Sequence, residues 1–309
     1  MFETILVGVD GREGGRDALA LAGRLAELDG GRVIVLHASP YAEFAAGNSV
    51  AGYDEALRAE ARKALKREVA ESGVEVADMI AVTDQSPGRA LHEWAARVRA
   101  DVVVVGSARH GKVGAVHFGD DVAGVLHGTA CPVVVAPRGI AARGIELRRI
   151  GVGFDGRDES REALRCAAAI ARLARGTLRV IAVVPPEPAV APASGYGFEW
   201  GVVARRSRDA MEEEVRHTVQ QLDIPASAET VVGLPAERLA EASRDLDLLV
   251  VGSRNYGPVR RVLPGSTSLR LTRRASCPVV VVPRGAGRPS AEAEEQSAMA
   301  GEGFEPSKA

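Results

Sequence analysis

Along the chain, short runs of apolar residues alternate with longer segments in which apolar residues recur at helical spacing. The first half contains five short apolar runs typical of strands buried on both faces: Thr4–Val9, Val33–Leu36, Val74–Val82, Val102–Val105 and Val133–Val135. Between these runs lie segments of helical character: Ala18–Leu28, a charged helix around Tyr53–Val69, a helix opened by Pro87 with Leu91, Trp94 and Val98, and a short helix at Val122–Leu126. This alternation predicts right-handed crossovers and a parallel sheet covered on both sides.

The second half of the chain repeats this order of strands and helices. Ile5–Arg12 returns as Ile150–Arg157, Val104–Ser107 as Val250–Ser253, and Cys131–Gly139 as Cys277–Gly285. The strands expected in the second half are Ile150–Phe154, Leu178–Val184, Ala226–Val232, Leu248–Val251 and Val279–Val282. A register kept over the whole unit predicts two copies of one fold.

The expected fold class is α/β, with two tandem doubly wound open sheets of five parallel strands each and helices on both faces. The first copy is expected at residues 1–139 and the second copy at residues 149–285, with a linker at 140–148. Residues 286–309 are rich in Gly, Pro, Ser, Ala and Glu, so we expect a disordered tail there.

Composition narrows the class of protein. Of the 309 residues 46% are hydrophobic and 26% charged, which is typical of a globular chain. The net charge of −2 gives no reason to expect nucleic acid or an anionic membrane as a partner. No apolar run could span a bilayer, and the chain starts directly with a strand pattern, so no signal peptide is expected. Two of the three cysteines, Cys131 and Cys277, are equivalent positions, which favours reduced thiols and a cytoplasmic location.

Unusual chemistry follows two strands of each copy. The first strand ends in Asp155-Gly156 in the second copy, and the fourth strand ends in Gly252-Ser253. In a doubly wound sheet, ligands bind beyond the carboxyl ends of the strands where the winding direction reverses. If the first and fourth strands are neighbours, these two ends face each other across that crevice.

The loop after the fourth strand of the second copy ends in Gly265-Ser266-Thr267-Ser268 at the start of a helix. Exposed N–H groups and small hydroxyls there form a ready anion site. Each feature also has a purely structural interpretation, because Ser266 can cap its helix and Asp155 can form an Asx turn.

Together these residues resemble a known nucleotide-binding motif. Gly252-x-x-Asn255, nine residues and then Gly265-Ser266, with Asp155 after the first strand, resemble the ATP-binding motif of the universal stress protein family, Gly-x-x-Gly, nine residues, Gly-Ser/Thr. The resemblance covers both copies. It implies that Asp155 and the backbone of Val183 hold adenosine, that Gly252 and Asn255 line the loop, and that Gly265, Ser266, Thr267 and Ser268 hold the phosphates of ATP, with or without Mg²⁺. Asn255 replaces a glycine, but Asn tolerates left-handed backbone angles.

The first copy departs further from the motif. It reads Gly106-x-x-Arg109, nine residues and then Gly119-Asp120-Asp121. A helix N-terminus attracts an anion by about 2 kcal/mol at best, whereas like charges about 4 Å apart repel by roughly 4 kcal/mol at an effective dielectric of about 20. We therefore predict that Asp120 caps its helix and that the first copy does not bind ATP in the family manner.

Two other motifs are weaker. Gly106–Lys112 approaches a P-loop, but Val113 follows where a Mg²⁺-binding hydroxyl is needed, and Pro258 replaces the lysine in the second copy. His110, His117 and His127 match no standard zinc spacing and have no counterparts in the second copy, so we expect no metal site.

Three function classes remain. The favoured one is a stress-response regulatory protein that binds ATP or another adenine nucleotide, such as cyclic AMP, in the second copy, with little or no catalysis. The alternatives are a protein-interaction module with both crevices vacant and a slow ATPase; the chain shows no nucleophile with a partnered base and no paired carboxylates at a strand end. The apolar fifth strands, Val133–Val135 and Val279–Val282, are expected to pair as an internal pseudo-dimer. A further homodimer of the whole chain is left open.

Overall fold

The computed structural model describes residues 1–40, 53–84, 86–107, 125, 129–186, 200–253, 270–271 and 274–283. Within them the strands are β1 (Thr4–Gly8), β2 (Arg32–Pro40), β3 (Asp78–Asp84), β4 (Val102–Gly106), β5 (Val133–Ala136), β6 (Arg149–Phe154), β7 (Thr177–Val184), β8 (Ala226–Val232), β9 (Leu248–Gly252) and β10 (Val279–Val282). The helices are α1 (Glu13–Asp29), α2 (Tyr53–Ser72), α3 (Pro87–Arg97), α5 (Asp158–Leu173), α6 (Trp200–Gln220) and α7 (Pro235–Ala242), with a 3₁₀ turn at Ser243–Asp245. The α/β class expected from the sequence is confirmed.

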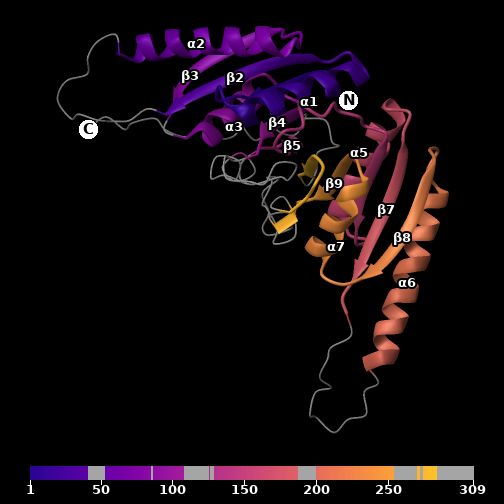
Figure 1. Ribbon diagram of the computed structural model, residues 1–309. Helices are drawn as coiled ribbons and strands as arrows, with labels where there is room; N and C mark the ends of the chain where they lie inside the picture. The colour runs from indigo at the N-terminus through magenta and orange to yellow at the C-terminus, as the bar shows by residue number, and fades with distance from the viewer. Residues whose placement is uncertain are drawn as a thin grey trace, which may run out of the picture.

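Both copies have the same strand order. In the first, β1 lies between β2 and β4, and the order is β3-β2-β1-β4-β5; in the second, β6 lies between β7 and β9. In each copy the second and third strands are added on one side of the first strand. The fourth and fifth strands are then added on its other side (Figure 1). The winding direction therefore reverses between β1 and β4 and between β6 and β9, as the sequence interpretation required.

The two five-stranded sheets are joined edge to edge. Strand β5 pairs antiparallel with β10, and Val134 lies opposite Val280. These are the two segments that the sequence analysis expected to pair. Each strand would be an edge of its own copy, but their pairing makes one sheet of ten strands in which β3 and β8 are the edges. The pairing thus covers the two most apolar edges of the separate copies.

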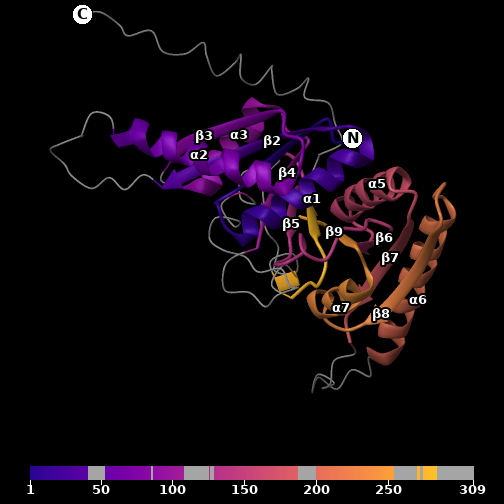
Figure 2. The same cartoon turned by 45° about the horizontal axis from the view of Figure 1, so that its top comes forward.

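Two apolar cores cover the faces of this sheet. Ile5 and Val7 of β1 face the core beneath α1 and α2, whereas Leu6 faces the core beneath α3. This alternation is the side-chain period of a strand, and it explains why strands covered on both faces read as continuous apolar runs. Residues of α5 and α6 continue the first core in the second copy, and those of α7 continue the second core (Figures 1 and 2).

One strand boundary differs from the expectation. The apolar run from Val74 to Val82 predicts a strand over its whole length, but β3 begins at Asp78. The segment before it still packs inward, because Val74 and Val76 contact the core between α2 and the strand. The residues between α2 and β3 are apolar because this connecting segment is buried. The pattern of apolar residues alone does not distinguish a buried connection from a strand.

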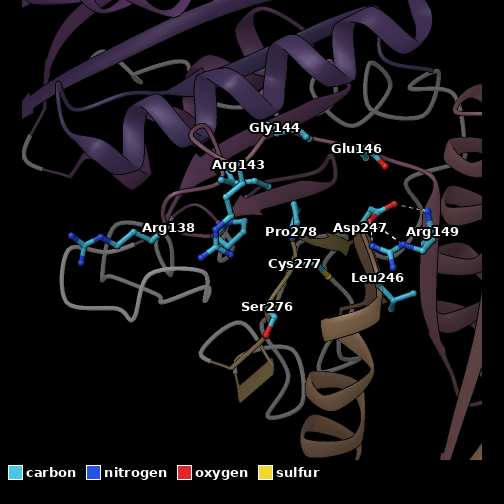
Figure 3. A pocket seen from close by; sticks show the side chains of 13 residues that line it. Arg138, Arg143, Gly144, Glu146, Arg149, Leu246, Asp247, Ser276, Cys277 and Pro278 are labelled. Carbon is cyan, nitrogen blue, oxygen red and sulfur yellow. Dashed lines mark hydrogen bonds and ion pairs between the residues drawn. The ribbon is translucent and has the colours of Figure 1, made fainter.

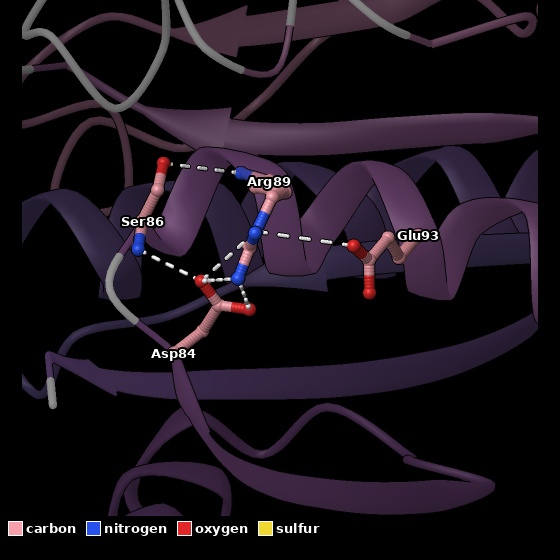
Figure 4. Close-up of polar contacts among 4 residues, drawn as sticks. All are labelled: Asp84, Ser86, Arg89 and Glu93. Carbon is pink, nitrogen blue, oxygen red and sulfur yellow. Dashed lines mark hydrogen bonds and ion pairs between the residues drawn. The ribbon is translucent and has the colours of Figure 1, made fainter.

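Helix α3 begins where Pro87 predicts it. The Ser86 hydroxyl accepts the Arg89 N–H at 3.3 Å and caps the helix, while Asp84 accepts the Ser86 N–H at 2.8 Å (Figure 4). The Arg89 guanidinium also contacts the Asp84 carboxylate at 3.1 Å, which raises the pKa of Arg89 through that hydrogen bond. Proline at the first helical position loses no hydrogen bond, because that N–H has no partner within the helix. The second copy repeats only the proline, Pro235 at the start of α7, because the capping position there is Leu234, which has no side-chain hydrogen bond to the helix.

Candidate functional site

The crevice of the second copy lies at the carboxyl ends of β6 and β9. These strands are parallel neighbours, with Val152 opposite Val250, so Asp155 and Ser253 leave the sheet at the same end. On the other side of β6, Phe154 pairs with Ala182, which places Val183 beside the same opening. The structure therefore brings together three residues of the predicted site, Asp155, Val183 and Gly252.

Asp155 forms a turn that leaves its carboxylate in solvent. Its Oδ1 accepts the Arg157 N–H at 3.2 Å, which is an Asx turn, and the Ser160 hydroxyl accepts the Asp155 N–H at 3.3 Å. The side chain is 55% exposed. The structural interpretation of Asp155 is thus correct. Its Oδ2 also forms a long ion pair with Arg157 Nε at 3.8 Å, and the exposed carboxylate has lone pairs left for a hydroxyl donor in the crevice.

An arginine and a glutamate hold the turn after Asp155. The Arg161 guanidinium donates to Glu214 Oε1 at 2.7 Å and to the Gly156 carbonyl at 3.1 Å. It also lies over the Phe154 ring, 5.7 Å from its centroid. These contacts connect α5 and α6 to the end of β6 and fix the direction in which Asp155 points.

The first copy keeps the turn but changes its support. Asp10 Oδ1 accepts the Arg12 N–H at 3.1 Å, as Asp155 does for Arg157. At the position of Ser160 stands Gly15, and a Cβ added there would lie 2.9 Å from Glu68 Oε1. The Glu68 carboxylate therefore occupies space that the equivalent serine fills in the second copy.

Glu68 is a buried carboxyl group beside the first-copy crevice. Its side chain is 6% exposed, and neither carboxylate oxygen has a well-formed hydrogen bond within the described residues. Burial raises the pKa of Glu68, and the charge of Asp10 raises it further, outweighing the nearby Gly11 N–H and Arg16. Burial also lowers the pKa of His37 on β2, against an opposing effect of Asp10. Burial thus shifts both Glu68 and His37 toward their uncharged forms beside this crevice.

Gly252 has a packing role that the sequence interpretation did not foresee. A Cβ at this position would lie 2.7 Å from the carbonyl oxygen of Glu159 in α5. In the first copy, a Cβ at Gly106 would lie 2.0 Å from the Gly14 carbonyl oxygen. Both glycines let a helix N-terminus approach a strand end, so a glycine here is explained without any ligand.

The remaining predicted residues lie outside the described part of the chain. In the second copy these are Asn255, Gly265, Ser266, Thr267 and Ser268; in the first copy they are Arg109, Gly119, Asp120 and Asp121. The expected tail at 286–309 and the histidines His110, His117 and His127 also lie there. Among the residues that are described, no group of three or more His, Cys, Asp or Glu side chains could hold a metal ion.

The two residues that hold the turn after Asp155 were not predicted from the sequence. Arg161 and Glu214 sit on solvated faces of charged helices, where single charges carry no distinctive pattern. The available signal was the duplication, because Glu68 and Glu214, and likewise Arg16 and Arg161, occupy equivalent places in the two copies. The repeated charges mark both positions as lying beside the turn, although only the second copy forms the ion pair.

The three cysteines are free thiols. Burial raises the pKa of Cys131 and of Cys166 to about 12, and it raises that of Cys277 as well. Thiols with raised pKa values are poor nucleophiles at neutral pH. They therefore act as packing residues, Cys131 and Cys277 just before β5 and β10 and Cys166 within α5.

The fold and the crevice define a class, a duplicated doubly wound α/β protein whose strand-end openings lie at the reversals of winding. The sequence profile of the universal stress protein family matches residues 1–137 and again residues 146–283. The chain therefore belongs to the universal stress protein family. None of the described helices is long and apolar enough to cross a membrane.

Several known proteins resemble the chain. A universal stress protein of Mycobacterium tuberculosis is 26% identical over 193 residues, covering 60% of this chain and 65% of the relative, so the match spans less than two thirds of that relative's length. One from Methanocaldococcus jannaschii is 29% identical over 141 residues, 44% of this chain and 81% of the relative.

Among solved structures, a universal stress protein of Archaeoglobus fulgidus covers 92% of this chain and 100% of its own, with a TM-score of 0.66 and 19% identity. One from Pseudomonas aeruginosa covers 96% of this chain and 98% of its own, with a TM-score of 0.60 and 18% identity. At this identity the two structures show the fold alone.

Proposed function

We propose that the second copy binds ATP or another adenine nucleotide and that the protein acts as a cytoplasmic stress-response regulator with little or no catalysis. The observation that carries this proposal is the position of Asp155. Its half-exposed carboxylate lies at the reversal of winding, at the same end of the sheet as Gly252 and Ser253, where the Gly-Ser-Thr-Ser loop begins. A carboxylate at this place can accept hydrogen bonds from the hydroxyls of a ribose.

The proposal gives each predicted residue a part in holding the nucleotide. Asp155 and the backbone of Val183 would hold the adenosine, and Gly252 and Asn255 would line the loop. Gly265 and the three hydroxyl residues Ser266, Thr267 and Ser268 would hold the phosphates, with Mg²⁺ as a counter-ion for the triphosphate. The phosphates would supply a charge that the helix N-terminus stabilises.

The first copy would not bind the nucleotide. Asp120 stands at the position of Ser266, so the carboxylate lies where the second copy has a hydroxyl. Added phosphate charge would meet acid there, and repulsion of roughly 4 kcal/mol at about 4 Å exceeds the attraction of a helix N-terminus.

A pair of exchanged residues tests the proposal. Ser266→Asp gives the second copy the acid of the first, and Asp120→Ser does the reverse. Calorimetric titration with ATP should show binding to the wild type and to Asp120→Ser, and a loss of at least about thirtyfold in Ser266→Asp, because the repulsion exceeds the attraction by about 2 kcal/mol or more. Heats that are absent in the wild type, or equal in wild type and Ser266→Asp, would overturn the nucleotide site.

A second candidate is a protein-interaction module of the same fold whose crevices hold no nucleotide. The packing of Gly252 against Glu159 favours it, because this glycine is then required by the fold alone. Mass spectrometry of small molecules released from the purified, denatured protein separates the two candidates. An adenine nucleotide at one equivalent per chain supports the regulator, and a protein that remains ligand-free when purified with added ATP supports the module.

We also propose that the β5–β10 pairing is the assembly state in solution, an internal pseudo-dimer within one chain. Its support is the antiparallel register of Val133, Val134 and Val135 with β10, in which all six valines are buried. Association of whole chains into a further homodimer would then use another surface. Sedimentation at several protein concentrations measures whether whole chains associate. A mass of one chain at every concentration supports pairing of the two copies within one chain.

A further inference from the structure

A cavity of about 590 Å³ lies under the linker between the two copies (Figure 3). Its walls are the linker residues 143–146, the end of β5 at Pro137 and Arg138, and the starts of β6, β9 and β10 at Arg149, Asp247 and Pro278. Because it meets β6 and β9 at their amino ends, it lies at the opposite end of the second sheet from the Asp155 crevice. It is therefore separate from the proposed nucleotide site.

The wall formed by the linker is held in place at both ends. The Asp17 side chain, 1% exposed in α1, accepts the Gly139 N–H at 2.7 Å and the Ala141 N–H at 3.0 Å. At the other end, Leu147 is 1% exposed within the core. Between them the Arg143 N–H donates to the Ile140 carbonyl at 3.1 Å. The cavity is thus preformed, so a ligand would not have to order its wall.

Two of the three arginines in the wall are already neutralised. Arg138 forms an ion pair with Glu13 at 2.7 Å, and Arg149 forms one with Asp247 at 2.7 Å. Burial alone would raise the pKa of Asp247, but the hydrogen bonds from Arg149 and from the Arg148 and Arg149 N–H groups lower it below its ordinary value. Asp247 therefore stays ionised and holds Arg149 against the wall.

The third arginine is Arg143. Its guanidinium makes no hydrogen bond or ion pair with any side chain in the described part of the chain. Figure 3 shows it reaching from the linker toward the start of β10, across the cavity from the Arg149–Asp247 pair. Glu146, the remaining carboxylate in the wall, lies on the Arg149 side, where its charge acts on Arg149. One guanidinium thus faces the cavity with its donors unused.

We propose that this cavity binds a small organic anion through Arg143. The guanidinium fork matches the two oxygens of a carboxylate or a phosphate. The volume exceeds what a bare oxyanion needs and falls in the range of small-molecule sites. Ile140, Ile145, Leu246 and Pro278 give the wall apolar surface for the rest of the molecule. A ligand there contacts the linker and the second copy together, so its occupancy would couple the two halves.

Two aromatic anions and one neutral analogue test the proposal. Benzoate and phenyl phosphate carry the two oxyanion types, and benzyl alcohol has the ring without the charge. Binding is followed by NMR through the amide signals of Gly144 and Ile145. At least one anion should bind the wild type with a dissociation constant below about 10 mM, and benzyl alcohol should bind at least about tenfold more weakly.

Arg143→Gln and Arg148→Gln form a matched pair. Both remove one positive charge from an exposed linker position, but Arg148 does not line the cavity. Arg143→Gln should weaken the anion at least about tenfold, and Arg148→Gln should leave it unchanged, with unchanged melting temperatures in both free proteins. Equal binding to Arg143→Gln, equal losses in the two variants, equal binding of benzyl alcohol, or no binding by either anion would each overturn the proposal. None of these outcomes depends on ATP.

Discussion

At the scale of single residues, equivalent positions in the two copies have diverged in ways that change their chemistry. Glu214 is half exposed and ion-paired with Arg161, whereas Glu68 is buried without a well-formed partner among the described residues. The difference follows from one neighbour, because Gly15 leaves the space that Ser160 fills. The two equivalent carboxyl groups therefore differ: Glu214 forms an ion pair, whereas burial raises the pKa of Glu68.

Replacing Glu68 by Gln should stabilise the protein at neutral pH. Burial raises the pKa of Glu68 above its ordinary value of 4.5, so the folded state binds more protons than the unfolded state in that window. The wild type therefore loses stability as the pH rises from about 4.5 through the folded pKa, and Glu68→Gln does not. We expect a gain on the order of 1 kcal/mol at pH 7, measured by urea unfolding at several pH values.

Glu214→Gln is the matched control. It removes an exposed ion pair with Arg161, which is typically worth about 0 to 1 kcal/mol, so this variant should be neutral or slightly less stable. A Glu68→Gln variant that follows the same pH dependence as the wild type would show that the buried carboxyl group does not titrate as described.

Among the helices and strands, the N-terminus of one helix in each copy packs closely against the end of the fourth strand. The contact of α1 with β4 requires Gly106, and that of α5 with β9 requires Gly252, because a Cβ would meet backbone oxygen in both places. Backbone cannot move aside as a side chain can. The approach fixes the width of the crevice between the first and fourth strands.

Gly106→Ala should therefore be more destabilising than Gly252→Ala. The added Cβ would lie 2.0 Å from the Gly14 oxygen in one case and 2.7 Å from the Glu159 oxygen in the other. Losses of about 1 to 3 kcal/mol are typical of overpacking, and guanidinium unfolding would measure them. Gly153→Ala is the comparison, since its Cβ would meet side chains and no backbone atom, Leu239 at 3.0 Å and Val251 at 3.4 Å. A loss in Gly106→Ala no larger than in Gly153→Ala would contradict this account.

The strands were predictable from the sequence because the sheet is covered on both faces. Val279–Val282 and Ala226–Val232 match β10 and β8 at both ends. The crevice was predictable too, because the duplication shows which strand ends carry Asp155 and Gly252. The role of Gly252 in packing was not predictable, since it depends on how closely α5 approaches β9. The cavity under the linker was hidden for the same reason, as its residues come from segments far apart in the chain.

At the scale of the whole molecule, the two copies form one sheet and share both cores. Residues from each copy appear in the core beneath α1 and α5 and in the core beneath α3 and α7. The joint between them is the β5–β10 pair, where Val134 is 1% and Val280 2% exposed. Two domains with a common sheet and common cores should unfold together.

Calorimetry should accordingly show one unfolding transition, with a van't Hoff enthalpy close to the calorimetric enthalpy. Val134→Asp and Val280→Asp, which place a charge at the joint from opposite copies, should each lower the melting temperature of the whole chain by several degrees or more, because an unpaired buried charge is costly. Ser227→Asp, at an exposed position of the edge strand β8, should change it little. Two separate transitions in the wild type would contradict a shared core.

On the function proposed above, the two crevices differ: the second accepts an adenine nucleotide and the first does not. A crystal structure of the chain grown with excess ATP and Mg²⁺ tests it most directly. We expect one nucleotide per chain, with its ribose at Asp155 and its phosphates at Gly265–Ser268. Nucleotide bound beside Asp10, or crystals with both crevices free of nucleotide, would contradict it.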